Sequence, residues 1–177
     1  IRKNDPEAKV VFIGPCVGKK VEIRRGEDSA EYGVTFEELA AMFDAMGINP
    51  AEEAENEQDG SKPGKNFAQS GGVAASVSQV LEEEGFDLPV SCTKCNGAKE
   101  CKKFLMLMNA GKMPDDILEG MACEGGCVAG PGGVETLQKL LRARTKLIAA
   151  ADNRGVTENV KTLHDFSGIN MEAHRRP

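Results

Sequence analysis

The segment that most limits how this chain can fold is MACEGGCVAGPGG, at residues 121–133. Cys123 and Cys127 are separated there by a glutamate and two glycines, a combination that disfavours a regular helix. Such glycines let the backbone pass close to a bulky group and direct its amides toward that group. Because iron–sulfur clusters are bound by cysteine thiolates and tuned by hydrogen bonds to their sulfur atoms, the pattern predicts a cluster-binding loop. The alternative is a glycine-rich turn into the following helix, with two cysteines that are simply buried.

A second cysteine segment, GPCVGKKVE, occupies residues 14–22. It follows the apolar run VVFI at residues 10–13, which is typical of a fully buried strand. Cys16 therefore lies at the carboxyl end of a strand, where α/β proteins usually build their sites. Lys19 places a cation near this thiol, which would lower the pKa of the thiol or hold an anionic ligand. The alternative is an ordinary loop with solvated lysines.

The remaining cysteines are Cys92, Cys95 and Cys101, in the segment CTKCNGAKEC. A CxxC pair with a third cysteine close behind resembles half of a zinc or iron–sulfur site. Cys101 also falls on the apolar face of an expected helix, where a buried structural thiol is common. A redox-active CxxC is a further alternative, although the segment does not follow the strand–CxxC–helix context of thioredoxin-like sites closely.

Elsewhere the chain alternates strand and helix patterns. Helices are expected from Thr35, which forms a capping box with Glu38, to Gly47, and over four later segments: 73–85, 98–111, 134–151 and 156–163. Further strands are expected over residues 87–91 and 117–122. This alternation predicts an α/β fold with a mainly parallel sheet flanked by helices. We expect an α/β lobe at residues 1–150, with an acidic loop at 50–66, and a C-terminal helix and tail at 151–177.

Composition narrows the classes of partner. Among 177 residues, Lys and Arg number 22 against 28 Asp and Glu, so the net charge is −6. That balance argues against nucleic acid or an anionic membrane surface as a partner. No apolar run is long enough to span a membrane and no signal peptide is present, so we expect a cytoplasmic protein. In that compartment clustered cysteines favour metal binding over three disulfides. The start at Ile1, close to a strand, suggests a piece of a longer protein.

Two of these motifs resemble those of one family. PCxxKKxE at residues 15–22 and MACxGGCxxG at 121–130 resemble two signature motifs of [FeFe] hydrogenases. FAQSGGV at 67–73 is similar to the family's FGxxGGV segment. Residues 32–47 are similar to a family segment that lies between the two signature motifs. The resemblance implies that the chain is one half of the two-lobed H-cluster domain.

The resemblance also implies roles for particular residues. Cys16, Cys123 and Cys127 would supply three of the four thiolates of a [4Fe–4S] cluster, with Cys127 bridging to the two-iron subcluster of the H-cluster. Lys19 would donate to a cyanide ligand of that subcluster, so Lys19 and Cys127 are the candidate catalytic residues. The cofactor pocket would be lined by Phe67, Ser70, Gly71 and Met121. The implied reaction is reversible heterolysis of H2 to protons and electrons, with a ferredoxin-like carrier or a fused iron–sulfur or sensor domain as partner.

The chain departs from the family pattern in several places. The motif that supplies the fourth cluster ligand and the proton-relay cysteine is missing, so the fragment alone should be inactive and could lack the cofactor. Gly14 replaces the usual Met, Glu124 a Pro and Pro131 a Gly. These departures resemble the divergent, sensory branches more than the fast catalytic ones. The alternatives are a non-catalytic zinc or iron–sulfur module for electron transfer or regulation, and a partner-binding domain that has kept only the scaffold.

Overall fold

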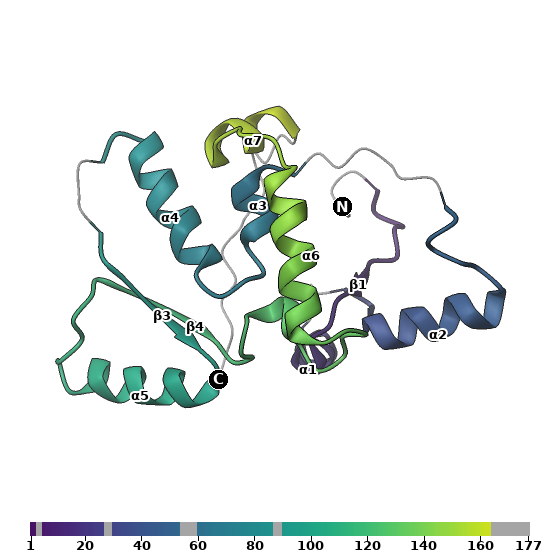
Figure 1. The fold of residues 1–177 in the computed structure, drawn as a ribbon, viewed down its shortest axis with the longest axis horizontal. Coiled ribbons are helices and arrows are strands. Elements are labelled where there is room, and N and C mark those ends of the chain that lie inside the picture. The colour runs from purple at the N-terminus through teal and green to yellow at the C-terminus, as the bar shows by residue number, and fades with distance from the viewer. Residues whose placement is uncertain (3–4, 27–29, 54–59, 87–89, 164–177) are drawn as a thin grey trace.

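The computed structural model describes residues 1–2, 5–26, 30–53, 60–86 and 90–163. The chain contains two β-α-β units; in Figure 1 the second lies at the lower left, whereas the first lies near the middle, below and beside α6 (Leu137–Ala149). The first consists of β1 (Val11–Ile13), α1 (Val17–Arg25) and β2 (Tyr32–Val34). The second consists of β3 (Cys92–Asn96), α5 (Ala98–Asn109) and β4 (Ile117–Met121). The expected basic tail, residues 174–177, lies outside the described residues.

Both units contain a parallel strand pair. β1 pairs with β2 in the register Val11↔Tyr32 to Ile13↔Val34, and β3 pairs with β4 in the register Cys92↔Ile117 to Asn96↔Met121. The expected α/β class with short parallel strands flanked by helices is confirmed. The described strands form two separate two-stranded sheets rather than one continuous sheet.

The other helices connect these two units. They are α2 (Phe36–Met46), α3 (Lys62–Asn66), α4 (Gly72–Glu83), α6 (Leu137–Ala149) and α7 (Val156–Leu163), with a short 3-10 turn η1 (Cys127–Ala129). In Figure 1, α3, α6 and α7 lie in the middle, α4 lies above β3 and β4, and α5 lies below them. The acidic segment expected to be a loop contains α3 at its end. None of the helices among the described residues is long and apolar enough to cross a membrane.

Local sequence signals explain the helix ends that were predicted correctly. The Thr35 hydroxyl accepts a hydrogen bond from the Glu38 amide, and the Glu38 carboxylate accepts one from the Thr35 amide, so the capping box is confirmed. α2 ends at Gly47, whose left-handed φ of 67° suits a glycine. α4, α5 and α7 also lie where the apolar spacing predicts helices, whereas α6 begins later than expected, at Leu137.

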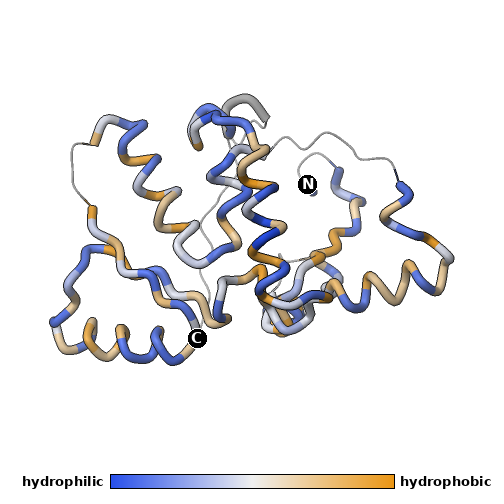
Figure 2. The backbone as a smooth tube through the Cα atoms, viewed as in Figure 1, coloured by the Kyte–Doolittle hydropathy of each residue, from blue (hydrophilic) through white to orange (hydrophobic). Residues whose placement is uncertain are grey.

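Several elements near the N-terminal end differ from expectation. β1 was expected to be fully buried, yet Val11, Phe12 and Ile13 are 46%, 37% and 47% exposed. Only β2 pairs with β1 in the described chain, so this small sheet cannot enclose its strands, and Figure 2 shows the apolar stretch at β1. α1 replaces the loop expected after Cys16. It was missed because it buries none of its residues and has no apolar face.

In the second unit, the first strand begins later in the sequence than expected. A strand was expected to end before Cys92, but β3 begins at Cys92 and includes both cysteines of the CxxC segment. The expected residues 87–89 lie outside the described part of the chain. Two of the buried apolar side chains are Met121, at the end of β4, and Ala74, near the start of α4. Part of the buried core therefore lies where β4 and α4 meet.

The C-terminal segment packs back on the rest of the chain. The Glu83 carboxylate at the end of α4 accepts hydrogen bonds from the amides of Val156 and Thr157, at 3.0 and 2.8 Å. Ala151 is buried, and the Asp152 carbonyl accepts a hydrogen bond from the Lys62 amide at 3.2 Å. The boundary at residue 150 stays a prediction.

Candidate functional site

The loop that carries Cys123 and Cys127 docks against the turn before α4. The Val128 amide donates to the Ala68 carbonyl at 3.0 Å, and the Ser70 amide donates to the Gly125 carbonyl at 3.4 Å. A Cβ added at Gly126 would lie only 2.5 Å from the Ser70 nitrogen and 2.6 Å from the Ala68 oxygen. Gly126 also has a φ of 96°, which side-chain-bearing residues rarely adopt. Glycine is therefore required at this position for the two segments to meet.

The same loop also contacts the segment that carries Cys16. The Gly132 amide donates to the Pro15 carbonyl at 2.8 Å, and a Cβ added at Gly130 would lie 2.5 Å from that oxygen. The Gly132 carbonyl in turn accepts a hydrogen bond from the Glu37 amide of α2 at 3.2 Å. The glycines of the loop thus bring the residue before Cys16 against the chain that follows Cys127.

The three predicted cluster cysteines interact electrostatically. Cys16 precedes the first residue of α1, Cys123 follows β4, and Cys127 begins η1. Partial burial raises the pKa of the Cys127 thiol, and the neighbouring Cys16 and Cys123 raise it further. The Lys19 ammonium opposes this shift in the pKa of Cys127. Cys127 thus lies within electrostatic range of Cys16, Cys123 and Lys19, which belong to segments that are far apart in the sequence.

The predicted pocket residues occupy different positions around this group. The Met121 sulfur lies 3.5 Å from the Cys127 sulfur, and Met121 is buried. Ser70 contacts the cysteine loop through its amide, as described above, and Gly71 follows with a φ of 89°. Phe67, at the end of α3, is 53% exposed. Met121 and Ser70 thus contact the cysteine loop, whereas the Gly71 amide donates to Glu119 and Phe67 presents an exposed ring.

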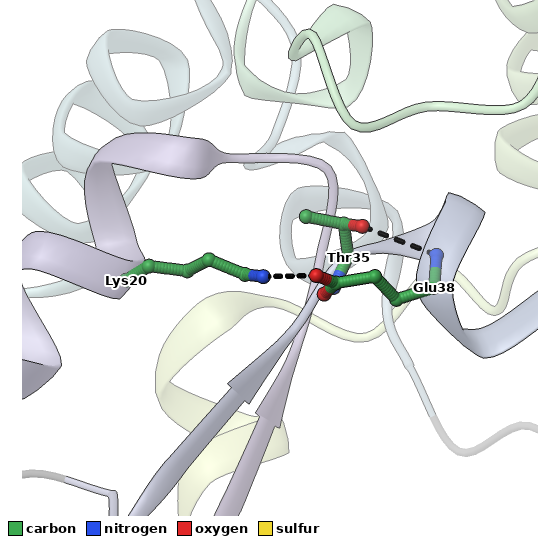
Figure 3. A network of polar contacts seen from close by, with 3 residues as sticks. All are labelled: Lys20, Thr35 and Glu38. Carbon is green, nitrogen blue, oxygen red and sulfur yellow. Dashed lines mark hydrogen bonds and ion pairs between the residues drawn. The ribbon is translucent and has the colours of Figure 1, made fainter.

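The two lysines of PCxxKKxE have separate partners. The Lys19 Nζ lies 2.6 Å from a carboxylate oxygen of Glu22, one helical turn later in α1. Lys20 forms an ion pair with Glu38 of α2, and Glu38 also caps its own helix through Thr35 (Figure 3). The hydrogen bond from Lys20, and then that from the Thr35 amide, lowers the pKa of Glu38. The motif therefore holds Lys19 beside the thiols and fastens α1 to the start of α2.

Glu119 is a site residue that the sequence analysis missed. It is 7% exposed, and its two carboxylate oxygens accept hydrogen bonds from the amides of Gly71 and Ala74, at 2.6 and 2.7 Å. These amides belong to the first turn of α4, where a helix favours a negative charge and where Gly71 offers no side-chain cap. Glu119 thereby ties β4 to the turn against which Gly126 packs. A single glutamate in the otherwise apolar ILEGM strand was the available signal.

The third cysteine segment does not form one cluster of ligands. Side chains alternate between the two faces of a strand, so Cys92 and Cys95 of β3 point to opposite faces. Cys95 is fully buried, and burial together with the neighbouring Cys101 raises the pKa of its thiol. Within the part of the chain that the structure describes, no group of three or more His, Cys, Asp or Glu side chains is arranged to hold a single metal ion.

The donor set at the first site has the chemistry of an iron–sulfur cluster site. Cys16, Cys123 and Cys127 supply thiolates, the ligands that such clusters use, and hard cations prefer oxygen ligands instead. The finding that no described group of three or more His, Cys, Asp or Glu side chains could hold a single metal ion applies to these cysteines too, so the fit rests on the chemistry of the thiolates. The residues present therefore fit the cluster that the sequence predicts.

Comparisons with known proteins agree with this arrangement. Residues 1–131 match the family model described as "Iron only hydrogenase large subunit, C-terminal domain". The chain is 29% identical, over 195 aligned positions, to the periplasmic [Fe] hydrogenase large subunit of Nitratidesulfovibrio vulgaris, covering 86% of this chain and 46% of that protein. It thus spans about half the length of that relative.

Solved structures share the fold. An [FeFe]-hydrogenase structure that concerns oxygen inactivation through the 2Fe subcluster of the H cluster has a TM-score of 0.62 and 23% identity, covering 85% of this chain and 55% of that one. A variant of the [FeFe]-hydrogenase HydA1 from Chlamydomonas reinhardtii has a TM-score of 0.56 and 21% identity, covering 89% and 56%. The family match shows that this chain belongs to the iron-only hydrogenase large subunit family, with residues 1–131 matching its C-terminal domain.

Proposed function

We propose that this chain is the part of an iron-only hydrogenase-like oxidoreductase that binds most of the H-cluster's cubane. The observation that carries the proposal is the gathering of Cys16, Cys123 and Cys127 beside Lys19, through a loop whose glycines permit the required close contacts. A structural neighbour is described as holding an H cluster with a 2Fe subcluster, which supports the same cofactor here.

In this proposal the three thiolates hold a [4Fe–4S] cluster, and Cys127 also contacts the two-iron subcluster. When bound, the cofactor supplies the site of reversible H2 cleavage and accepts the electrons. Lys19 places a positive charge beside the anionic ligands, and Glu22 restrains its ammonium from one turn away. The Met121 sulfur contacts the sulfur of Cys127 at 3.5 Å and would form part of the wall of the cofactor pocket.

A [4Fe–4S] cluster takes four thiolates, and this site contributes three. We propose that the fourth thiolate and the proton relay come from a part of the protein outside these 177 residues, and that the chain alone is inactive. Its relative is about twice as long, which leaves room for them. Protons and H2 are the proposed substrates, with a ferredoxin-like carrier or a fused iron–sulfur or sensor domain as electron partner. The cytoplasm is the proposed location, because cysteines clustered beside glycines favour metal binding over structural disulfides.

A sensory rather than a fast catalytic role is supported by the change at position 14. The ring of Phe12 lies 3.0 Å from where a Cβ of residue 14 would be. A side chain at position 14 would require this ring to shift slightly, so the methionine usual in the family would change the packing two residues before Cys16. Because the groups around a cofactor tune its reactivity, we expect slower turnover than in fast hydrogenases.

Infrared spectroscopy of the complete protein, matured with its two-iron subcluster, tests the proposal. The bands of the cyanide and carbonyl ligands should be present in the wild type and lost in Cys127→Ala. The matched variant Cys92→Ala should retain them, because Cys92 lies on β3 away from the three thiols. Lys19→Met should shift the cyanide bands, whereas Lys20→Met should leave them unchanged. Full bands in Cys127→Ala would contradict the proposal.

A zinc or iron–sulfur module built on the third cysteine segment gives a different result. Elemental analysis of the purified chain would then show stoichiometric zinc or iron that disappears in Cys92→Ala and persists in Cys127→Ala. The strand geometry of β3 opposes this outcome, because it separates the thiols of Cys92 and Cys95.

A further inference from the structure

Cys95 and Cys101 lie on the same face of the β3–β4 sheet. In the parallel register Cys95 pairs with Gly120, and paired residues of neighbouring strands direct their side chains to the same face. A Cβ added at Gly120 would lie 3.3 Å from the Cys101 sulfur, so this sulfur sits over Gly120 on the face that Cys95 shares. The Cys101 thiol also lies 3.6 Å from the Met121 carbonyl. The two thiols therefore adjoin the space that Gly120 leaves without a side chain.

The two thiols differ in their access to solvent. Cys95 is 0% exposed, whereas Cys101 is half-buried in the first turn of α5. Cys101 lines an open hollow of about 560 Å³, together with apolar residues that include Leu105, Met106 and Ala122. A small molecule in this hollow can reach Cys101 but not Cys95. Cys92 is on the opposite face of β3 and cannot substitute for Cys95.

We propose that Cys95 and Cys101 form a redox-active dithiol, which a small-molecule disulfide such as glutathione disulfide oxidises to an intramolecular disulfide. This site needs no cluster and does not depend on the proposed hydrogenase function. In reducing compartments such disulfides are usually transient and regulatory.

The chemistry takes place in two exchange steps. The Cys101 thiolate attacks one sulfur of glutathione disulfide, the bond between its sulfurs breaks, and one glutathione leaves with the proton that Cys101 lost. The Cys95 thiolate then attacks the Cys101 sulfur, and the second glutathione leaves with the proton from Cys95. The protein dithiol loses two electrons, and the glutathione disulfide gains them as it becomes two thiols.

The disulfide would act on the segment that leads to Cys123. The amides of Gly97 and Ala98 donate to the carbonyls of Met121 and Ala122, at 2.8 and 3.0 Å. Asn96 also accepts a hydrogen bond from the Gly125 amide at 2.6 Å. A bond from Cys95 to Cys101 would span this connection and fasten the start of α5 to the sheet, immediately beside the cysteine loop.

Peptide mass spectrometry of the full chain can detect this bond directly. The reduced chain is treated anaerobically with glutathione disulfide, its remaining thiols are blocked with N-ethylmaleimide, and the product is digested with trypsin. Because Lys94, Lys99 and Lys102 are cleavage sites, the cysteines fall on separate peptides, CNGAK for Cys95 and ECK for Cys101. We expect these two peptides to be recovered joined by a disulfide in the wild type and in Cys92→Ser.

Two variants test the order of the steps. Cys95→Ser should accumulate glutathione on Cys101, because no second thiol can displace it. Cys101→Ser should leave Cys95 unmodified, because the reagent cannot reach Cys95. This second variant tests the proposal independently, so a folding defect in Cys95→Ser would not affect it. Wild-type protein that retains glutathione on Cys101 without the joined peptides would overturn the proposal. So would a disulfide that joins Cys92 to either thiol.

Discussion

Alanine at position 126 should weaken the fold far more than alanine at another glycine with a positive φ. Gly126 has a φ of 96° and a ψ of −173°, a region that is essentially restricted to glycine and costs other residues about 1–3 kcal/mol. Its Cβ would also lie between 2.5 and 2.7 Å from three backbone atoms of residues 68–70, which cannot rotate away as a side chain can. Overpacking of this kind adds about 1–3 kcal/mol.

The two contributions together give an expected loss of about 2–6 kcal/mol in the free energy of unfolding. Gly47→Ala is the matched control, because Gly47 has a φ of 67° but a Cβ there would meet nothing within 4 Å. Its expected loss is only about 1–2 kcal/mol, the cost of a left-handed conformation. The chain as a whole should be stable by about 5–15 kcal/mol, so Gly126→Ala removes a large part of that stability.

Urea denaturation of the full chain, followed by circular dichroism, measures both losses. Equal losses in the two variants would refute the reasoning, because the close contact with residues 68–70 would then contribute nothing. A stable Gly126→Ala protein that still binds iron would show in addition that the loop does not need this docking to form the site.

Three further predictions concern carboxylates that join elements of the fold. Glu119→Gln should lower the free energy of unfolding in urea by about 1–3 kcal/mol, because a glutamine side chain has only one acceptor oxygen for the two backbone N–H groups that Glu119 binds. Glu124→Gln should change the free energy of unfolding little. Hydrogen bonds from the Thr157 side chain and amide, and then from Gln79 and the Val156 amide, lower the pKa of Glu83 from 4.5 to about 2. Its stabilising effect is therefore present above pH 4.5 and is lost as the pH falls from there toward 2. Glu83→Gln should therefore flatten the pH dependence of the unfolding free energy in that window, and an unchanged slope would contradict the link to α7. Lys20→Met should lower the free energy of unfolding by less than about 1 kcal/mol in thermal unfolding, because the ion pair of Lys20 with Glu38 is partly exposed. A loss of several kcal/mol would contradict this assignment of a small stabilising effect to the pair.

The elements that could be predicted from the sequence are those specified by local chemistry. The capping box at Thr35 and the left-handed glycine at Gly47 involve residues within one helical turn, so α2 could be assigned without knowledge of any other segment. The two cysteine motifs are similarly local, because the glycines that allow the close contacts lie within the motifs themselves.

The features that were missed depend on long-range contacts or on backbone conformation. The exposure of β1 depends on how many strands join it, and the capping role of Glu119 depends on α4, which lies more than 40 residues earlier in the chain. The prediction of a half-site at Cys92 and Cys95 assumed a turn at the CxxC segment. The strand β3 instead places the two thiols on opposite faces, which no spacing rule could distinguish.

The electron paramagnetic resonance spectrum of the chain, reconstituted anaerobically with iron and sulfide and then reduced, tests the central claim most directly. We predict the signal of a reduced [4Fe–4S] cluster in the wild type and in Cys92→Ser, with an external thiol in place of the fourth ligand, and its loss in Cys16→Ser and Cys123→Ser. A cluster signal that survives in Cys16→Ser, or one that is lost only when Cys92 is replaced, would contradict the assignment of Cys16, Cys123 and Cys127 to one site.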